Sequence, residues 1–375
     1  MHFNFNPGYF SIDENQFSTT VAANGRLGFY DYYDNAMGQG FIVKGKNILF
    51  EMGLIMGNAP NKVINNVRRL TDSADVDFVS TKKISENRPG KYSAYEITGQ
   101  FSDKNAGNSQ LDVLVDYRSM VWQEAPLDSF VIIEYSIRNN SSFAINDFYA
   151  GIFADWDISD RGQMDHALYE AAHDLGVAYN PDSDEKIFAG VQALTGPAGA
   201  YTNKNTFLFD GFSDAEKFIA ISNHYDALAN LTDISQVIWQ GPFDISANEE
   251  IKIAFAIHGT TSYEGIINSA IYADSIYNYT LKAPVPQVEA DTICYGSGSV
   301  LTASGANNFH WYNSFTGGDK VGEGSSIAVA NLRSDTILYV ANADQSYQSV
   351  RAPAFVRVKA NPEVKVLGET NFCPG

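Results

Sequence analysis

Acidic side chains gather in one short stretch, which reads Asp-Trp-Asp-Ile-Ser-Asp from Asp155 to Asp160, and Asp165 follows shortly after it. The stretch comes directly after an apolar segment that has the residue types of a β-strand. In an extended chain Asp155 and Asp157 project to the same side. The loop that follows can bring Asp160 or Asp165 towards them. Converging carboxylates repel one another unless a cation neutralises them.

Three interpretations of this acidic loop stay open. Calcium takes six to eight oxygen ligands in flexible geometry, which predicts a calcium site at Asp155, Asp157, Asp160 and Asp165, although the glycine and terminal glutamate of an EF-hand loop are missing. In the second interpretation the aspartates cap a turn and the next helix, with Trp156 in the core. In the third, two of the carboxylates form a pair for glycoside hydrolysis. Calcium is the one cofactor that the sequence predicts.

Other patterns that could support catalysis are weak. The sequence contains no Cys-x-x-Cys and no His-Glu-x-x-His, and His166 and His173 are too far apart in sequence to chelate one ion. The segment Gly259-Thr260-Thr261-Ser262-Tyr263 lacks the Met-Ala of a subtilisin-type nucleophile segment, and Ser262 suits a helix N-cap. His258 beside it does not make a triad. We therefore expect no catalytic residues and no enzyme.

Aromatic residues offer a different kind of site. Tyr30, Tyr32 and Tyr33 could form a platform for sugar rings, but with 21 tyrosines in the chain ordinary packing in a β-core is the favoured interpretation.

The composition limits the partners. The chain has 375 residues, 45% of them hydrophobic and 18% charged, with a net charge of −19. This charge would repel nucleic acid and anionic membrane surfaces, and no apolar run approaches the ~18 residues of a membrane helix. The first residues, Met1-His2-Phe3-Asn4, do not resemble a signal peptide. We expect an exported, soluble segment of a longer protein.

The elements that position these residues are mostly strands. Residues 111–117 and 130–137 are rich in β-branched and aromatic side chains, and the second segment alternates apolar and polar residues as a half-buried antiparallel strand does. A further strand is predicted over 205–209. Helical spacing of apolar residues predicts a short helix within 163–175 and a stronger one over 262–279.

A short proline-containing linker, Lys282-Ala283-Pro284-Val285-Pro286, places a domain boundary. After it, strand signals recur every ~10 residues, as in a small sandwich. The sequence therefore predicts an all-β protein: a large antiparallel β-sandwich with one or two short helices over residues 1–283, then an immunoglobulin-like sandwich over 284–361. A further, truncated repeat is expected over 362–375.

The C-terminal part resembles the immunoglobulin-like repeats of large secreted proteins of Bacteroidetes. An ordered series carries the resemblance: Ile293-Cys294-Tyr295-Gly296, Phe309-His310-Trp311-Tyr312 and Asp335-Thr336-Ile337-Leu338-Tyr339-Val340. The resemblance implies that Trp311 is the core tryptophan of the sandwich. It also implies a second cysteine near position 347, where this sequence has Tyr347. Cys294 is thus expected to be a free, buried thiol rather than bonded to Cys373.

The N-terminal part resembles the region that follows the catalytic domain in secreted subtilisin-like peptidases of Bacteroidetes that carry a type IX secretion signal. The resemblance spans about 24–280 and rests on motifs such as Arg26-Leu27-Gly28-Phe29 and Leu49-Phe50-Glu51-Met52-Gly53. It implies an extracellular or cell-surface location and a multidomain parent. The expected function is a non-catalytic accessory, spacer or binding region that contacts neighbouring domains and a protein or glycan ligand. The alternative is a carbohydrate-binding or glycan-acting domain that uses the loop around Asp155 and Asp157.

Overall fold

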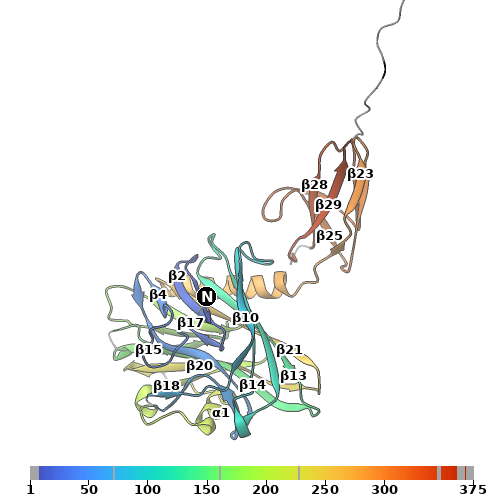
Figure 1. The fold of residues 1–375 in the computed structure, drawn as a ribbon. Helices are drawn as coiled ribbons and strands as arrows, with labels where there is room; N and C mark the ends of the chain where they lie inside the picture. The colour runs from blue at the N-terminus through green and yellow to red at the C-terminus, as the bar shows by residue number, and fades with distance from the viewer. Residues whose placement is uncertain are drawn as a thin grey trace, which may run out of the picture. The chain divides into compact units, whose positions relative to one another are not determined.

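The structure is a computed structural model that describes residues 8–70, 72–159, 162–226, 229–343, 348–360 and 368. The chain divides into two compact units, Met1–Ser275 and Ile276–Gly375 (Figure 1). Strands dominate both units, which confirms the predicted all-β class.

Two antiparallel sheets make up the large unit. The first has the order β18-β20-β14-β6-β3-β2-β4-β5, with β1 beside β2 and β7 beside β6. Its strands are β1 Tyr9–Ile12, β2 Phe17–Ala22, β3 Arg26–Leu27, β4 Phe41–Val43, β5 Lys46–Asn47, β6 Leu49–Ala59, β7 Lys62–Asn65, β14 Ile145–Trp156, β18 Ala198–Lys204 and β20 Ile234–Ile245. A separate hairpin joins β8 Arg68–Leu70 to β9 Ser73–Ala74.

The second sheet has the order β10-β11-β12-β13-β21-β17-β16-β15-β19. Its strands are β10 Val79–Asn87, β11 Tyr95–Ser102, β12 Val113–Val121, β13 Phe130–Asn139, β15 Asp165–Glu170, β16 Leu175–Tyr179, β17 Phe188–Ala193, β19 Ala229–Thr232 and β21 Glu250–Thr260. Short 3₁₀ turns occupy Gly107–Ser109 and Asn205–Phe207.

A single apolar core lies between the two sheets, and residues from both contribute to it. The strand β13 places Ile133, Tyr135 and Ile137 in this core and turns the intervening Glu134 and Ser136 away, as its alternation predicts. In β14 the residue Trp156 is buried in the same core. The large unit is therefore the predicted sandwich.

Two helices cover the outer faces of this sandwich. Helix α1, Asp214–Ser222, packs on β6, β14 and β20 of the first sheet, and helix α2, Tyr263–Ser275, packs on β13, β17 and β21 of the second. Ser262 accepts a hydrogen bond from the Gly265 amide at 3.0 Å, so its predicted capping role is confirmed. A π-helical stretch, Ile276–Leu281, follows α2.

Two predicted elements are wrong. The segment 163–175 is not a helix, because Asp165–Glu170 pairs as β15 with β16 in a hairpin, and Glu170 lies opposite Leu175. The segment 205–209 is not a strand, because β18 ends at Lys204 and a 3₁₀ turn begins at Asn205. In the first segment the hairpin partner decides the structure, and in the second Asn205 is held by the distant residues Asp155 and Asp233, so the residue pattern alone does not determine either element.

The second unit contains an immunoglobulin-like sandwich. One sheet has the order β22-β24-β27 and the other β23-β29-β28-β25-β26. Trp311 is fully buried between them, and its Nε1 donates to the Gly324 carbonyl at 2.9 Å. The strands are β22 Gln287–Val288, β23 Asp291–Cys294, β24 Ser299–Ser304, β25 Phe309–Tyr312, β26 Lys320–Glu323, β27 Ser326–Val329, β28 Thr336–Asn342 and β29 Ala352–Lys359.

Cys294 is a free thiol, as expected, but it is exposed rather than buried. The reason is the alternation along β23, which turns Ile293 towards the core of the sandwich and Cys294 away from it. Tyr347 and Cys373 lie outside the described residues. So does the predicted further repeat over 362–375, apart from residue 368.

Candidate functional site

Asp155 lies on the outer face of the first sheet because of its place in β14. Along this strand Ile152, Ala154 and Trp156 face the core between the sheets, whereas Phe153 faces the side that α1 covers. Successive side chains of a strand alternate between faces, so Asp155 shares the face of Phe153. It is buried there, close to the end of the strand.

A second carboxylate lies directly opposite. Glu51 of β6 is the register partner of Asp155 and is fully buried. Opposed carboxylates would destabilise the strand pair, but Arg68 lies between them. Its Nε donates to Glu51 at 3.0 Å, and its Nη2 donates to Asp155. Arg26 also donates to Glu51, at 3.3 Å. We call Arg26, Glu51, Arg68 and Asp155 the charged cluster.

Arg68 and Asp155 of the charged cluster are both ionised at neutral pH. Burial alone would lower the pKa of Arg68, but the carboxylates of Asp155 and Glu51 outweigh burial and raise it, so the guanidinium stays charged. Burial raises the pKa of Asp155 to about 6 although Arg68 opposes the shift, so this carboxyl is ionised at neutral pH.

Asn205 extends the charged cluster towards the next strand. Its Nδ2 donates to Asp155 at 2.5 Å and also to Asp233, which lies just before β20. Burial raises the pKa of Asp233, and the hydrogen bond from Asn205 opposes this shift. One amide therefore ties together two carboxylates that are distant in sequence.

Asp157 differs from the other carboxyl groups of the site in its surroundings. No hydrogen bond or ion pair to its carboxylate is found within the described part of the chain. Burial raises its pKa to about 7, and the charges of Asp155, Asp233 and Asp165 add to the shift. Gly162 lies beside it with φ of +66°, and a Cβ there would stand 2.9 Å from Asp157 Oδ1. Glycine at this position therefore leaves room for the carboxylate.

Asp155, Asp157 and Asp233 open onto a cleft of about 300 Å³, which we call the acidic cleft. Aromatic side chains make up much of its wall, namely those of Tyr32, Tyr33, Phe50 and Phe209. Tyr33 and Phe209 are 53% and 57% exposed. Two of the three tyrosines considered as a sugar platform therefore lie at this cleft.

The backbone of Tyr33 is strained. Its φ is +72°, a conformation that a bulky side chain rarely adopts. Asp31 holds the loop in place by accepting hydrogen bonds from the Ala36 and Met37 amides, each at 2.9 Å, and Asn35 donates to the Phe50 carbonyl at 2.8 Å. Strain of this kind concentrates at ligand sites.

The structure gives the three described aspartates of the predicted calcium site different surroundings. Asp155 and Asp157 line the acidic cleft, whereas Asp165 caps the turn after β14 by accepting from the Ile158 and Ser159 amides, both at 2.8 Å. Asp160 lies outside the described residues. Within the described part of the chain, no group of three or more His, Cys, Asp or Glu is arranged to hold a metal ion. Calcium binding stays a prediction.

Two of the histidines considered from the sequence are packed against neighbouring side chains. His258 is fully buried, its Nδ1 lies 2.8 Å from Ser269 Oγ of α2, and burial lowers its pKa to about 3. His166 packs against the Tyr179 ring. Among the described residues, no helix has the length and apolar character needed to cross a membrane.

Sequence reasoning missed most of the cleft. Arg26, Glu51, Arg68, Asn205 and Asp233 were not recognised as site residues. One signal was present: Glu51 interrupts the apolar run Leu49–Ile55, and a charge buried in such a strand needs a partner. The identity of that partner depends on which strands are neighbours.

Comparison with known proteins identifies part of the second unit. Residues 282–362 match the family described as Ig-like domain CHU_C associated. This match agrees with the resemblance to immunoglobulin-like repeats of Bacteroidetes. No curated protein matches the sequence.

Some solved structures are weakly similar to the chain. The Slr1438 protein from Synechocystis sp. PCC 6803 has 9% identity and a TM-score of 0.40 over 70% of this chain and 99% of that chain. A mutant of heparan sulfate lyase HepC from Pedobacter heparinus has 9% identity and a TM-score of 0.36 over 87% of this chain and 42% of that chain. The GalM/aldose epimerase homologue from C. elegans has 8% identity and a TM-score of 0.34 over 68% of this chain and 99% of that chain. TM-scores this low carry no argument about function.

Proposed function

We propose that the chain is a non-catalytic accessory region of a larger secreted, multidomain protein, and that its large unit binds carbohydrate in the acidic cleft. The immunoglobulin-like domain at 282–362 supports the accessory role. A subtilisin-like peptidase as the parent protein stays a prediction from the resemblance of the sequence. The ligand assignment rests on the lining of the cleft.

The observation that carries the ligand assignment is the pairing of aromatic rings with carboxyl groups in one cleft. A sugar ring has an apolar C–H face and a rim of hydroxyl groups. The exposed rings of Tyr33 and Phe209 suit the apolar face, and Asp157 and Asp233 suit the hydroxyls. Hydrogen bonds from hydroxyls to ionised carboxylates are among the stronger ones in proteins. Apolar walls with a few fixed polar groups are typical of ligand sites.

The surroundings of the cleft hold these groups in place before a ligand arrives. Arg68 and Asn205 fix Asp155, and Asn205 also fixes Asp233. A site whose side chains are already ordered loses less conformational entropy on binding. Asp157, to whose carboxylate no partner is found among the described residues, is then the carboxyl that can adjust to the ligand.

A glycan-acting function is the second candidate, and the pKa values favour it. At neutral pH Asp155 is ionised, whereas the pKa of Asp157 near 7 leaves about half of its carboxyl groups protonated. A protonated and an ionised carboxyl near one another are what glycoside hydrolysis requires. Release of reducing sugar that disappears in Asp157→Asn would support this candidate over simple binding.

Binding to a glycan array tests the proposed function. We expect wild-type protein to bind a defined set of glycans and Asp157→Asn to lose at least about tenfold in affinity, a loss of ~1.4 kcal/mol. Asp147→Asn is the matched control, because Asp147 lies at the opposite, exposed end of the same strand. Absence of glycan binding by the wild type, or an equal loss in both variants, would overturn the proposal.

A further inference from the structure

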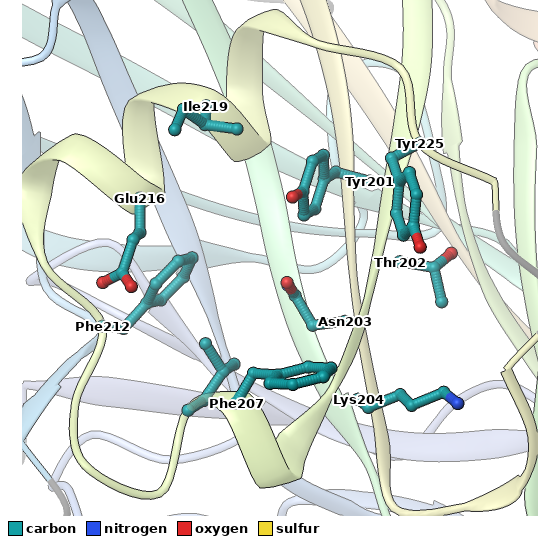
Figure 2. A pocket seen from close by; sticks show the side chains of 10 residues that line it. Tyr201, Thr202, Asn203, Lys204, Phe207, Phe212, Glu216, Ile219 and Tyr225 are labelled. Atoms are coloured by element: carbon teal, nitrogen blue, oxygen red, sulfur yellow. The ribbon is translucent and has the colours of Figure 1, made fainter.

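A second hollow opens on the same face of the large unit, between β18, α1 and the loop that joins them. Its volume is about 390 Å³. Figure 2 shows Tyr201 and Asn203 entering it from β18, Ile219 and Glu216 from α1, and Phe207 from the connecting loop. We call this hollow the tyrosine pocket.

Large apolar side chains are exposed around the tyrosine pocket. Phe207 is 71% exposed, Tyr225 is 52% exposed and Ile219 is 43% exposed. The rings of Tyr201 and Tyr225 lie 5.4 Å apart at 37°. Exposed apolar side chains that gather in one place mark interaction sites, whereas scattered ones do not.

A polar group in the tyrosine pocket lacks a partner. Nδ2 of Asn203 is shielded from solvent, and no hydrogen bond to it is found within the described part of the chain. Figure 2 shows this side chain directed into the hollow from β18. Buried polar groups in proteins are almost always hydrogen-bonded. An acceptor on a bound ligand would satisfy this donor.

Backbone groups of β18 at the tyrosine pocket are already hydrogen-bonded, so they cannot pair with a peptide strand. Thr202 N donates to the Tyr225 carbonyl at 2.9 Å, and Tyr225 N donates to the Ala200 carbonyl at 2.8 Å. Peptide recognition by strand addition needs free backbone groups at a sheet edge. Recognition in the tyrosine pocket must therefore come from side chains, namely aromatic rings and an amide, which suit sugar rings.

The tyrosine pocket adjoins the acidic cleft. Leu208 lines both hollows, and its neighbours face one each: Phe207 the tyrosine pocket and Phe209 the acidic cleft. The Cα atoms of Phe207 and Phe209 are at most about 7.6 Å apart, because consecutive Cα atoms are separated by ~3.8 Å. Adjacent rings of one sugar chain can span so short a distance.

We propose that the tyrosine pocket is a second subsite, which binds the extension of a neutral oligosaccharide whose first ring lies in the acidic cleft. This inference rests on the proposed function. Neutral chains are favoured because Asp155, Asp157 and Asp233 in the cleft, together with the net charge of −19, repel anionic sugars.

The test compares oligosaccharides of increasing length. Cello-, xylo- and manno-oligosaccharides from disaccharide to hexasaccharide are titrated calorimetrically into the full chain. For the series that binds, wild-type affinity is expected to rise with length. Tyr225→Ala is expected to remove the rise, with about tenfold weaker hexasaccharide binding and unchanged disaccharide binding. The matched control is Phe143→Ala, which removes a 78% exposed ring elsewhere on the unit.

Each alternative outcome has a distinct meaning. Binding of short and long sugars with a length dependence that survives in Tyr225→Ala would overturn the second subsite and leave the proposed function standing. A preference for anionic oligosaccharides would overturn the neutral ligand. If none of the series binds and the glycan array is also blank, both proposals fall. A thermal melt of Tyr225→Ala like that of the wild type confirms that the exposed substitution leaves the fold intact.

Discussion

The large unit buries a charged cluster, with Glu51, Arg68 and Asp155 on one face of its first sheet. The described ion pairs of the immunoglobulin-like unit, such as Lys320 with Glu323, lie instead at its exposed surface. The core of that unit is apolar around Trp311. Buried ion pairs contribute little net stability compared with apolar packing. The charged cluster is therefore not explained by stability alone, and it lies beside the ligand site that we propose.

Removing the central cation should give the largest effect. Arg68→Met leaves Asp155 buried without its cationic partner and Glu51 with Arg26 alone, so we expect the free energy of unfolding of the large unit to fall by about 3–5 kcal/mol. Urea unfolding followed by amide hydrogen exchange resolves the two units. Lys320→Met is the matched control, since it breaks an exposed pair, and no measurable change is expected. Equal small losses in both variants would contradict the distinction between the units.

A substitution in the other unit sharpens the comparison. Trp311→Phe removes the hydrogen bond to the Gly324 carbonyl and leaves a small cavity. We expect the immunoglobulin-like unit to lose about 1–3 kcal/mol of unfolding free energy. Hydrogen exchange in the large unit should not change. Loss of protection in both units would show that they are energetically coupled.

The carboxyl of Asp157 should make the stability of the large unit sensitive to pH. Folded Asp157 keeps its proton up to about pH 7, whereas the unfolded chain loses it near 3.8. The folded state therefore binds more protons between these values, and stability falls as pH rises from 4 to 7. The shift corresponds to ~4 kcal/mol in full, and partial exposure reduces it.

We therefore expect Asp157→Asn to be about 1–2 kcal/mol more stable than the wild type at pH 8, and equal to it at pH 4. Denaturant unfolding at both pH values measures the difference. Asp147→Asn, at the exposed end of β14, should follow the wild-type profile. A variant whose advantage is the same at both pH values would show that Asp157 does not titrate in this way.

Calcium provides the smallest expected effect. Because Asp155 and Asp165 are engaged elsewhere, a calcium site in the acidic loop would depend on Asp157 and Asp160. Free calcium at about five times its Kd would raise the unfolding free energy by about 1 kcal/mol. Thermal melts with calcium and with EDTA measure this difference. Wild-type melts that are identical with calcium and with EDTA would remove calcium from the account, and a calcium effect of the same size in Asp157→Asn would remove Asp157 from the site.

The spacing of apolar residues correctly predicted elements that bury one face. The strand over 130–137 and the helix over 262–279 were recognised, because each buries one face in the way that its spacing dictates. The segment 163–175 was mistaken for a helix, since a tight hairpin can also bring apolar residues into helical spacing. Only the pairing of β15 with β16 distinguishes a hairpin from a helix in this segment.

The candidate site could be predicted in part. Asp155 and Asp157 were found because they are close in sequence and project to one side of a strand. Their partners Arg68 and Asn205 lie 87 and 50 residues from Asp155. No local pattern reveals that β14 lies between β6 and β20. Knowledge of the strand order would have revealed the charged cluster.

The same strand order determines when the acidic cleft forms during folding. Its groups come from strands and loops near Glu51, Asp155 and Asp233, which pair over separations that span most of the large unit. Contacts of such high sequence separation form slowly, because loop-closure entropy must be overcome first. The cleft is therefore complete only when the centre of the first sheet has closed. A chain exported unfolded would acquire the proposed ligand affinity late in folding, so glycan binding, where it is found, would report on complete folding.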